Sequence, residues 1–260
     1  MTKLPTTDII KQLVQVNDSV AGWTRCKEKE RFIYLNENGG VLNRKEELER
    51  IKQLVIPPIW SDVWICKLPN GHLQSTGRDL RRRKQYIYHP DWTAYRQAMK
   101  FRKIRDFAYQ LPKLRKTAAV HLKDKSWTKR KVLALIVQVL DNCHIRIGNK
   151  YYKEKNNTFG LTTLRRKHLE ITDDNLIRFE YKAKSNKYRK VSMDSRKLAK
   201  LVQQCSELRG YEVFRYQENG KTYPIDSSDV NTYIQEIAGE QFSAKDFRTW
   251  AGTSLAVENY

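Results

Sequence analysis

Cysteine is scarce in this sequence, and the few that occur suggest neither a zinc site nor a disulfide framework. The 260 residues include four, Cys26, Cys66, Cys143 and Cys205. They show no CxxC spacing, and no histidine stands at a zinc-ligand distance from them in the chain. We expect four buried, reduced thiols in a reducing compartment.

Long apolar runs are absent as well. Residues 1–5 lack the apolar core of a signal peptide, and no run of about 18 apolar residues occurs that could cross a membrane. The chain is therefore expected to be soluble and intracellular, with no membrane partner.

Motifs for metals, nucleotides and RNA are also missing. The sequence has no HExxH motif, no EF-hand loop and no convincing carboxylate cluster for Mg²⁺, so we expect no metal. It has no glycine-rich phosphate loop, so use of ATP is not expected, and we predict no cofactor. The sequence contains no RNP run of the RRM type and no KH-type GxxG loop, so RNA is a less favoured partner than DNA.

Basic residues, in contrast, are abundant and concentrated. Residues 78–190 carry 31 basic and 10 acidic side chains, whereas residues 1–77 carry 11 and 9 and residues 191–260 carry 8 and 10. The middle block alone therefore accounts for the net charge of +21. Clustered lysines and arginines displace counterions from phosphates, which favours nucleic acid as the partner. A solvated helix face is the alternative explanation.

The first third of the chain alternates like strands joined by turns. Strands are predicted at 23–25, 32–34, 63–67, 72–76 and 84–88, with the turn-forming Pro69-Asn70-Gly71 between the third and the fourth. A short helix is predicted at 45–53, ended by Ile56-Pro57-Pro58.

After Pro90 the pattern becomes helical. Helices are predicted at 95–111, 129–140, 196–205, 228–238 and 244–257, and the second of these is apolar enough to be buried on most sides. Ser243 is a plausible N-cap of the last helix. A β hairpin is predicted at 179–191 with Ser185 and Asn186 at its tip. We therefore predict an α+β protein, with a small β-rich domain at 1–89 and a mostly α-helical domain at 90–260 that contains a short β hairpin.

Three cations stand in sequence contexts suited to holding one phosphodiester. They are Arg146 in His144-Ile145-Arg146-Ile147-Gly148-Asn149, Lys184 in Lys182-Ala183-Lys184-Ser185, and Arg248 in Asp246-Phe247-Arg248-Thr249-Trp250. Two guanidinium groups can stabilise the charge of a five-coordinate phosphorus, and a lysine can protonate the departing alkoxide. Taken singly, each residue is weak evidence, because most arginines and lysines lie on a solvated surface.

The contexts resemble those of the type IB DNA topoisomerases, specifically the small poxvirus-like and bacterial group. The matching segments run through nearly the whole chain in consistent order: 56–60, 63–66, 71–79, 83–86, 88–90, 146–149, 159–164, 182–185 and 244–250. The resemblance implies an enzyme that relaxes supercoiled double-stranded DNA by nicking one strand through a 3′-phosphotyrosyl intermediate and resealing it, without ATP or metal. It also implies that 1–89 is a DNA-binding domain and 90–260 the catalytic domain.

By motif position, the resemblance makes Arg146 and Arg248 the two phosphate-clamping arginines and Lys184 the general acid. The family usually has glycine where this chain has Ala183. Asn149, Lys150, Tyr152 and Thr163 fall in a segment that contacts backbone phosphates in the family, although helix-capping and surface roles remain open. A second candidate DNA surface mixes cations and aromatics: Gln74, Arg78, Arg81, Arg82, Arg83, Lys84, Tyr86 and Tyr88. About half of these are expected to face solvent or core instead.

The family's nucleophilic tyrosine is expected beyond Arg248, and no tyrosine of this sequence matches its position. Tyr260 resembles a continuing helix, so we expect a chain that is cut before the nucleophile and that binds DNA without relaxing it. A tyrosine recombinase or integrase would share the catalytic cations, but the segments at 56–58 and 71–79 favour the topoisomerases. A non-catalytic DNA-binding module is the other alternative.

The resemblance implies a monomer with no obligate protein partner. It places the protein in the cytoplasm at the nucleoid if the source is bacterial, and in the virion or host cell if the source is viral.

Overall fold

The computed structural model describes residues 10–29 and 31–259, except the side chain of Tyr152, and it divides into two compact units. One unit extends to Arg102 and the other begins at Lys103, so the division falls within one long helix rather than at the 89/90 boundary expected from the sequence. The expectations about residues 1–5 and Tyr260 lie outside the described residues.

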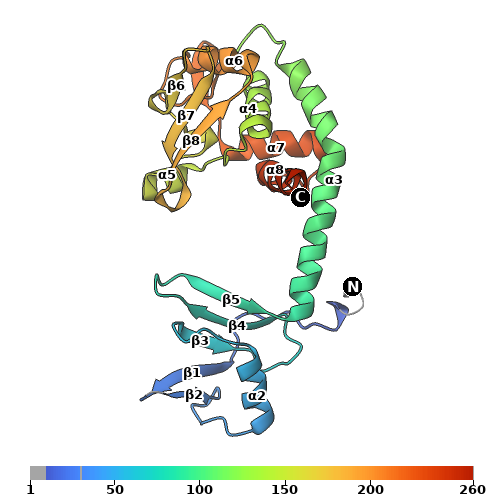
Figure 1. Ribbon diagram of the computed structural model, residues 1–260, viewed down its shortest axis with the longest axis vertical. Coiled ribbons are helices and arrows are strands. Elements are labelled where there is room, and N and C mark those ends of the chain that lie inside the picture. The colour runs from blue at the N-terminus through green and yellow to red at the C-terminus, as the bar shows by residue number, and fades with distance from the viewer. Residues whose placement is uncertain (1–9, 30, 260) are drawn as a thin grey trace. The chain divides into compact units, whose positions relative to one another are not determined.

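The first unit is built on a five-stranded antiparallel sheet in the order β2-β1-β3-β4-β5 (Figure 1). Its strands are β1 (Trp23–Glu28), β2 (Arg31–Leu35), β3 (Ser61–Ile65), β4 (Leu73–Arg78) and β5 (Lys84–Tyr88), and α2 (Lys45–Gln53) joins β2 to β3. The five predicted strands and the helix are confirmed, and β5 and α2 have the predicted bounds.

A small apolar core holds α2 against this sheet. Ile51 of α2 packs with Trp23, Val63 and Ile65 from the strands, and all four side chains are buried. Arg25 of β1 donates to the carbonyls of the segment that follows the helix, Ile56–Trp60, at 2.8–3.1 Å. One guanidinium group thus satisfies three backbone carbonyls of this segment, those of Ile56, Pro57 and Trp60.

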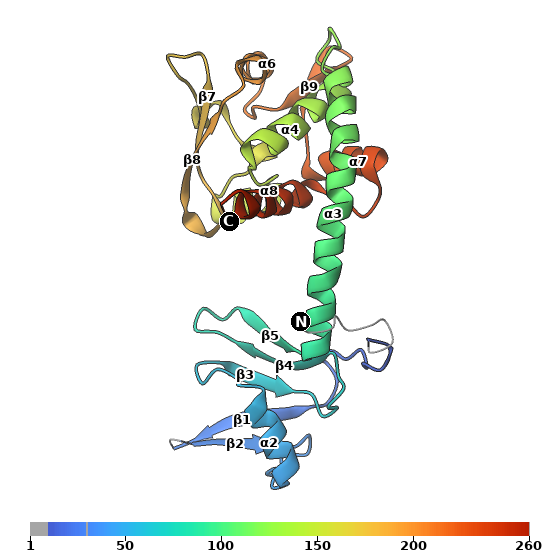
Figure 2. The same ribbon diagram turned by 45° about the vertical axis from the view of Figure 1, so that its right-hand side comes forward.

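The second unit is organised around a buried helix, α4 (Lys129–Cys143), as Figure 2 shows. Residues 131–137 of α4 are all buried, and the helix contacts three further helices, so the prediction of burial on most sides is confirmed. The surrounding helices are α6 (Arg196–Ser206), α7 (Ser227–Ala238) and α8 (Ala244–Glu258). Ser243 is the N-cap of α8, as predicted.

The helix predicted at 95–111 is much longer in the structure. It is α3 (Pro90–His121), which begins at one proline and continues through Pro112. Proline suits the first helical position but costs about 3 kcal/mol in a helix interior. Burial of Leu111 and Leu114 on either side of Pro112 offsets that cost, and this packing was not visible in the local sequence.

The predicted hairpin is present within a three-stranded antiparallel sheet in the order β6-β7-β8. These strands are β6 (Leu169–Ile171), β7 (Ile177–Lys182) and β8 (Tyr188–Met193). The sequence prediction missed β6, the second hairpin β9 (Arg215–Glu218) and β10 (Lys221–Pro224), and the short helix α5 (Lys150–Asn156). The α+β class is confirmed.

The four cysteines are free thiols, and three are buried. Cys26 is exposed, so the expectation of four buried thiols is wrong for that residue. Cys26 pairs with Ile33 of β2 on one side. On its other side β3 does not reach it, because β3 pairs with β1 only at Trp23 and Thr24. Burial raises the pKa of Cys143 and of Cys205 to about 12. Among the described residues, no helix is both long and apolar enough to cross a membrane.

Candidate functional site

Arg146 lies on a loop that begins where α4 ends. His144 caps α4 in the left-handed conformation, with φ of 51°, and its amide donates to the carbonyl of Leu140 at 3.1 Å. Ile145 is buried, which fixes the chain against the core. Arg146 follows immediately and its side chain is exposed. The core helix therefore holds the backbone of this arginine while leaving its guanidinium group open to a ligand.

The same loop is fastened to residues 160–163. The carbonyl of Arg146 accepts a hydrogen bond from the amide of Leu161, and the carbonyl of Ile147 accepts one from the amide of Thr162, both at 2.7 Å. The loop approaches so closely that a Cβ placed on Gly160 would lie 2.6 Å from the Arg146 carbonyl oxygen. Glycine is therefore required at 160 for this geometry.

Arg248 reaches the Arg146 loop from α8. Its guanidinium Nη1 donates to the backbone carbonyl of His144, two residues before Arg146, across a sequence separation of 104 residues. Burial, with the nearby charges of Arg146 and Arg189, lowers the pKa of Arg248. Arginine nevertheless keeps its charge at neutral pH. The two arginines that the sequence singled out thus act on each other electrostatically.

Lys184 lies at the tip of the β7–β8 hairpin, and it is exposed. The turn is tight, because Ser185 and Asn186 both adopt positive φ and the amide of Ala183 donates to the carbonyl of Lys187 at 2.8 Å. At the base of the turn, the carbonyl of Lys182 accepts a hydrogen bond from the amide of Phe159 at 2.8 Å. Phe159 precedes Gly160, so the hairpin is fastened to the same segment that holds the Arg146 loop.

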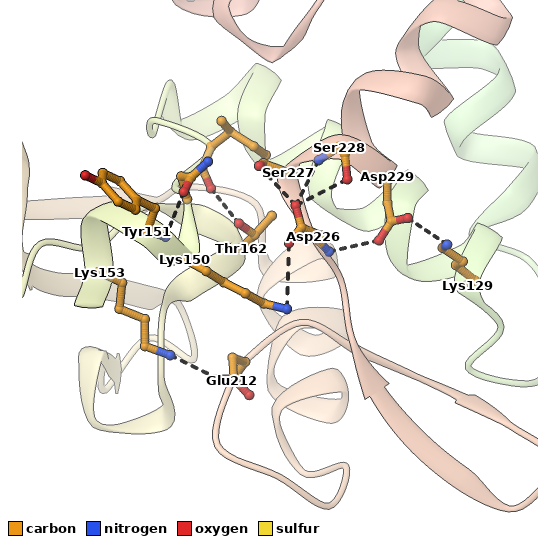
Figure 3. Close-up of polar contacts among 12 residues, drawn as sticks. Lys129, Lys150, Tyr151, Lys153, Thr162, Glu212, Asp226, Ser227, Ser228 and Asp229 are labelled. Atoms are coloured by element: carbon orange, nitrogen blue, oxygen red, sulfur yellow. Dashed lines mark hydrogen bonds and ion pairs between the residues drawn. The ribbon is translucent and has the colours of Figure 1, made fainter. Parts of the chain in front are cut away.

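Three of the remaining predicted residues of this unit, Asn149, Lys150 and Tyr152, lie at the start of α5, and Figure 3 shows Lys150 with its side chain directed to Asp226. Asn149 is the N-cap of α5 and accepts from the amide of Tyr151 at 2.8 Å. Lys150 is exposed and pairs with Asp226 at 3.7 Å. Tyr152 lies on α5, but its side chain is not among those described.

Thr163 lies inside the unit rather than on its surface. It is 3% exposed, and its hydroxyl donates to the carbonyl of Gly160 at 2.9 Å. Thr163 thus holds Gly160, the residue that lies against the backbone of the Arg146 loop.

In the first unit, the second candidate surface gathers on β5 and on the turn that precedes it. Lys84, Tyr86 and Tyr88 share one exposed face of β5, and the two rings stack at 6.0 Å between centroids. Both tyrosines are at least 41% exposed, so neither is part of the core. Stacked aromatics beside a lysine suit contact with bases or sugars.

The turn between β4 and β5 carries the arginine run. Arg81, Arg82 and Arg83 are exposed, and Arg83 pairs with Asp79 at 2.6 Å. Arg78 pairs with Asp62 at 3.6 Å and donates to the carbonyl of Arg82 at 3.0 Å.

Gln74 differs from the rest of this surface set because it is buried, with 3% exposure. Its amide donates to the carbonyls of Leu68, Pro69 and Gly71, and its oxygen accepts from Arg50 at 2.8 Å. The side chain holds the turn before β4 and is not available on the surface.

One further cation was missed from the sequence. Arg189 of β8 is the cross-strand partner of Tyr181, and its charge acts on both Tyr181 and Arg248. Its position shortly after the predicted hairpin tip was the available signal, because paired residues in an antiparallel hairpin lie on one face. Among the described residues, no three His, Cys, Asp or Glu side chains form a group that could hold a metal ion.

Comparisons with known proteins agree with this arrangement. Residues 89–260 match the family described as the catalytic core of eukaryotic DNA topoisomerase I, and residues 31–79 match the N-terminal domain of bacterial DNA topoisomerase IB. The DNA topoisomerase 1B of Acanthamoeba polyphaga mimivirus is 30% identical over 242 residues, which cover 91% of this chain and 72% of that protein. The chain belongs to the type IB DNA topoisomerase family.

Proposed function

We propose that this chain binds duplex DNA and holds one backbone phosphate between Arg146 and Arg248, for a nicking and closing reaction that relaxes supercoils without ATP or metal. The observation that carries the proposal is the hydrogen bond from Arg248 to the carbonyl of His144. It brings a helix from the end of the chain to the loop that presents Arg146. Two guanidinium groups side by side match the non-bridging oxygens of a phosphodiester.

The charges around the two arginines support this role. Among the residues that the structure describes, no carboxylate forms an ion pair with Arg146 or Arg248, although many other cations of this unit are paired. Unpaired neighbouring guanidinium groups repel each other, and an anion between them removes that repulsion. A DNA phosphate is such an anion, and its affinity for the chain should fall with added salt.

Lys184 is proposed as the general acid. In the cleavage step a tyrosine phenol loses its proton to solvent as its oxygen bonds to phosphorus, the bond from phosphorus to the 5′ oxygen breaks, and Lys184 gives its proton to that oxygen. Religation reverses each transfer, so the energy of the phosphodiester is kept in the 3′-phosphotyrosyl bond and no ATP is consumed. An exposed lysine on a tight turn can reach a DNA strand lying outside the unit.

The exposed residues of the first unit are proposed to contact the duplex as well. Lys84, Tyr86 and Tyr88 supply an aromatic and cationic strand face, and Arg81 and Arg82 supply charge beside it. Asn149 and Lys150 are proposed as backbone contacts in the second unit.

None of the described tyrosines is assigned as the nucleophile. Tyr181 and Tyr233 are buried, and Tyr233 is further engaged with His121 at 2.7 Å. A tyrosine recombinase would use the same cations, but the match of residues 31–79 to a topoisomerase N-terminal domain favours the topoisomerase.

Supercoiled plasmid in EDTA tests the proposal, together with binding of a short duplex by fluorescence anisotropy. The chain is expected to bind the duplex in a salt-dependent way and to leave the plasmid supercoiled. Arg146→Ala and Arg248→Ala should each weaken binding. Relaxation by the chain itself would show that one of its tyrosines is the nucleophile, and Tyr181→Phe would be the first variant to examine. Absence of binding would refute the proposal.

The role of Lys184 is tested separately in a form of the protein that cleaves DNA. Lys184→Ala is expected to slow cleavage while leaving affinity within a few-fold. A substrate with sulfur at the 5′ bridging position should restore the rate, because a thiolate leaves without needing a proton. A large loss of affinity would instead assign Lys184 to DNA docking.

A further inference from the structure

Arg189 occupies the rim of the same site, on a strand that the two clamping arginines do not share. In the register of β7 and β8 it lies directly opposite Tyr181, so both side chains are on one face of the sheet. Along that face of β8 the exposure increases from Met193, which is 1% exposed, through half-buried Val191 to exposed Arg189. Arg189 is therefore the first residue of β8 to leave the core on this face.

The β8 strand runs beside the end of α4, from which the Arg146 loop begins. The two elements are in contact, and the thiol of Cys143 lies 4.0 Å from the carbonyl oxygen of Ser192. Burial raises the pKa of Tyr181, and the charges of Arg189, Arg248 and Arg146 each oppose that rise. One phenol therefore lies within electrostatic reach of all three guanidinium groups.

Arg189 is also without a carboxylate partner among the described residues, whereas its neighbour Lys190 pairs with Glu180 at 2.6 Å. Three positive groups around one point repel one another in the free protein. Such an arrangement is favourable once an anion occupies the space between the groups.

We propose that Arg189 is a third phosphate-binding arginine of the site, which contacts the DNA backbone beside the phosphate held by Arg146 and Arg248. The inference rests on the proposed function, because it takes the same duplex as the ligand. It differs from the hairpin-tip role of Lys184, since Arg189 lies at the core rim and contributes a fixed positive charge rather than a proton.

The matched control for Arg189→Ala is Lys190→Ala. Both variants remove one positive charge from adjacent positions of β8, but successive residues of a strand point to opposite faces. The affinity of each variant for a short duplex is measured by anisotropy over a series of salt concentrations. Arg189→Ala is expected to bind several-fold more weakly and to lower the slope of log K against log salt by about 0.9, the value for one phosphate contact. Lys190→Ala should keep the slope of the unsubstituted chain.

A second variant separates charge from fold. Arg189→Lys keeps a cation at the rim and should keep most of the slope, and thermal unfolding of all three variants should match that of the unsubstituted chain. Equal reduction of the slope in Arg189→Ala and Lys190→Ala, or full reduction in Arg189→Lys, would overturn the assignment. If the unsubstituted chain binds DNA and only the Arg189 variants behave otherwise than expected, this inference fails while the proposed function stands. If the unsubstituted chain shows no salt-dependent binding, the proposed function itself fails.

Discussion

Gly160 is the position where a single methyl group should disturb the site most. An added Cβ would lie 2.5 Å from the amide nitrogen of Gly148 and 2.6 Å from the carbonyl oxygen of Arg146. Both are backbone atoms, and they cannot rotate away as a side chain can. Gly160→Ala must therefore push the Arg146 loop from residues 160–163, where two backbone hydrogen bonds of 2.7 Å now hold it.

The expected cost follows from that overlap. Overpacking a well-packed site typically costs about 1 to 3 kcal/mol. The gain from restricting the unfolded chain, about 0.4 to 1 kcal/mol for Gly to Ala, offsets only part of this. Because 1 kcal/mol lowers Tm by about 2 to 4 °C in a domain of this size, a decrease of several degrees is expected. DNA affinity should fall as well, since Arg146 moves with its loop.

Gly252→Ala is the control for this prediction. Gly252 lies within α8, and a Cβ added there meets nothing within 4 Å. Alanine in a helix is favoured over glycine by about 0.5 to 1 kcal/mol, so this variant should unfold at a slightly higher temperature. Both variants are compared by calorimetry and by duplex binding. If Gly160→Ala matched the unsubstituted chain in both measurements, the contact between the two segments would not constrain Arg146, and the reasoning would be refuted.

The polar groups of both units support three further predictions. Arg248→Lys removes the fork that reaches the His144 carbonyl, so in a form of the protein that cleaves DNA the cleavage rate should fall by about 10²- to 10³-fold; an unchanged rate in single-turnover cleavage would contradict this. Burial, with the charges of Lys167 and Arg165, lowers the pKa of His168 from 6.5 to about 4, so the unfolded chain binds more protons between these values. Stability should therefore fall as pH decreases from 6.5 towards 4, and urea unfolding of His168→Gln should show a weaker decrease over that range. Replacing Arg81 and Arg82 by alanine should lower the salt slope of DNA binding by about 0.9 for each phosphate that the chain no longer binds. Arg83→Ala should lower it less, because Arg83 pairs with Asp79 at 2.6 Å, whereas Arg82 pairs with Asp62 at the longer distance of 3.6 Å. An unchanged slope in the double variant would remove this turn from the interface.

The elements that the sequence predicted well are those whose pattern is local. Strand β5 alternates regularly, and α2 ends before a pair of prolines, so both bounds were readable. The length of α3 could not be predicted from the local sequence, because burial of the residues on either side of Pro112 depends on helices that come later in the chain. The β9–β10 hairpin is only four residues on each side and was missed for lack of a sustained alternation.

In the candidate site, too, local motifs identified residues, whereas contacts between distant segments could not be predicted. The motifs around Arg146 and Arg248 pointed to both residues, but only the folded chain shows the bond from Arg248 to the His144 carbonyl. Thr163 was expected to contact DNA because of the family resemblance, and Gln74 because it belongs to a segment that mixes cations with aromatics. The structure buries both, since each has hydrogen-bond partners in its own loop that no spacing rule reveals. Arg189 was missed because its significance lies in a partner across the hairpin.

His144 closes the left-handed turn after α4, and its carbonyl also receives the guanidinium of α8. Local opening of α8 would therefore remove one of the contacts that hold the Arg146 loop, and the amides of that loop should exchange faster whenever α8 opens. A chain in which α8 frays would lose Arg248 first, while the backbone hydrogen bonds to Leu161 and Thr162 would still hold the Arg146 loop.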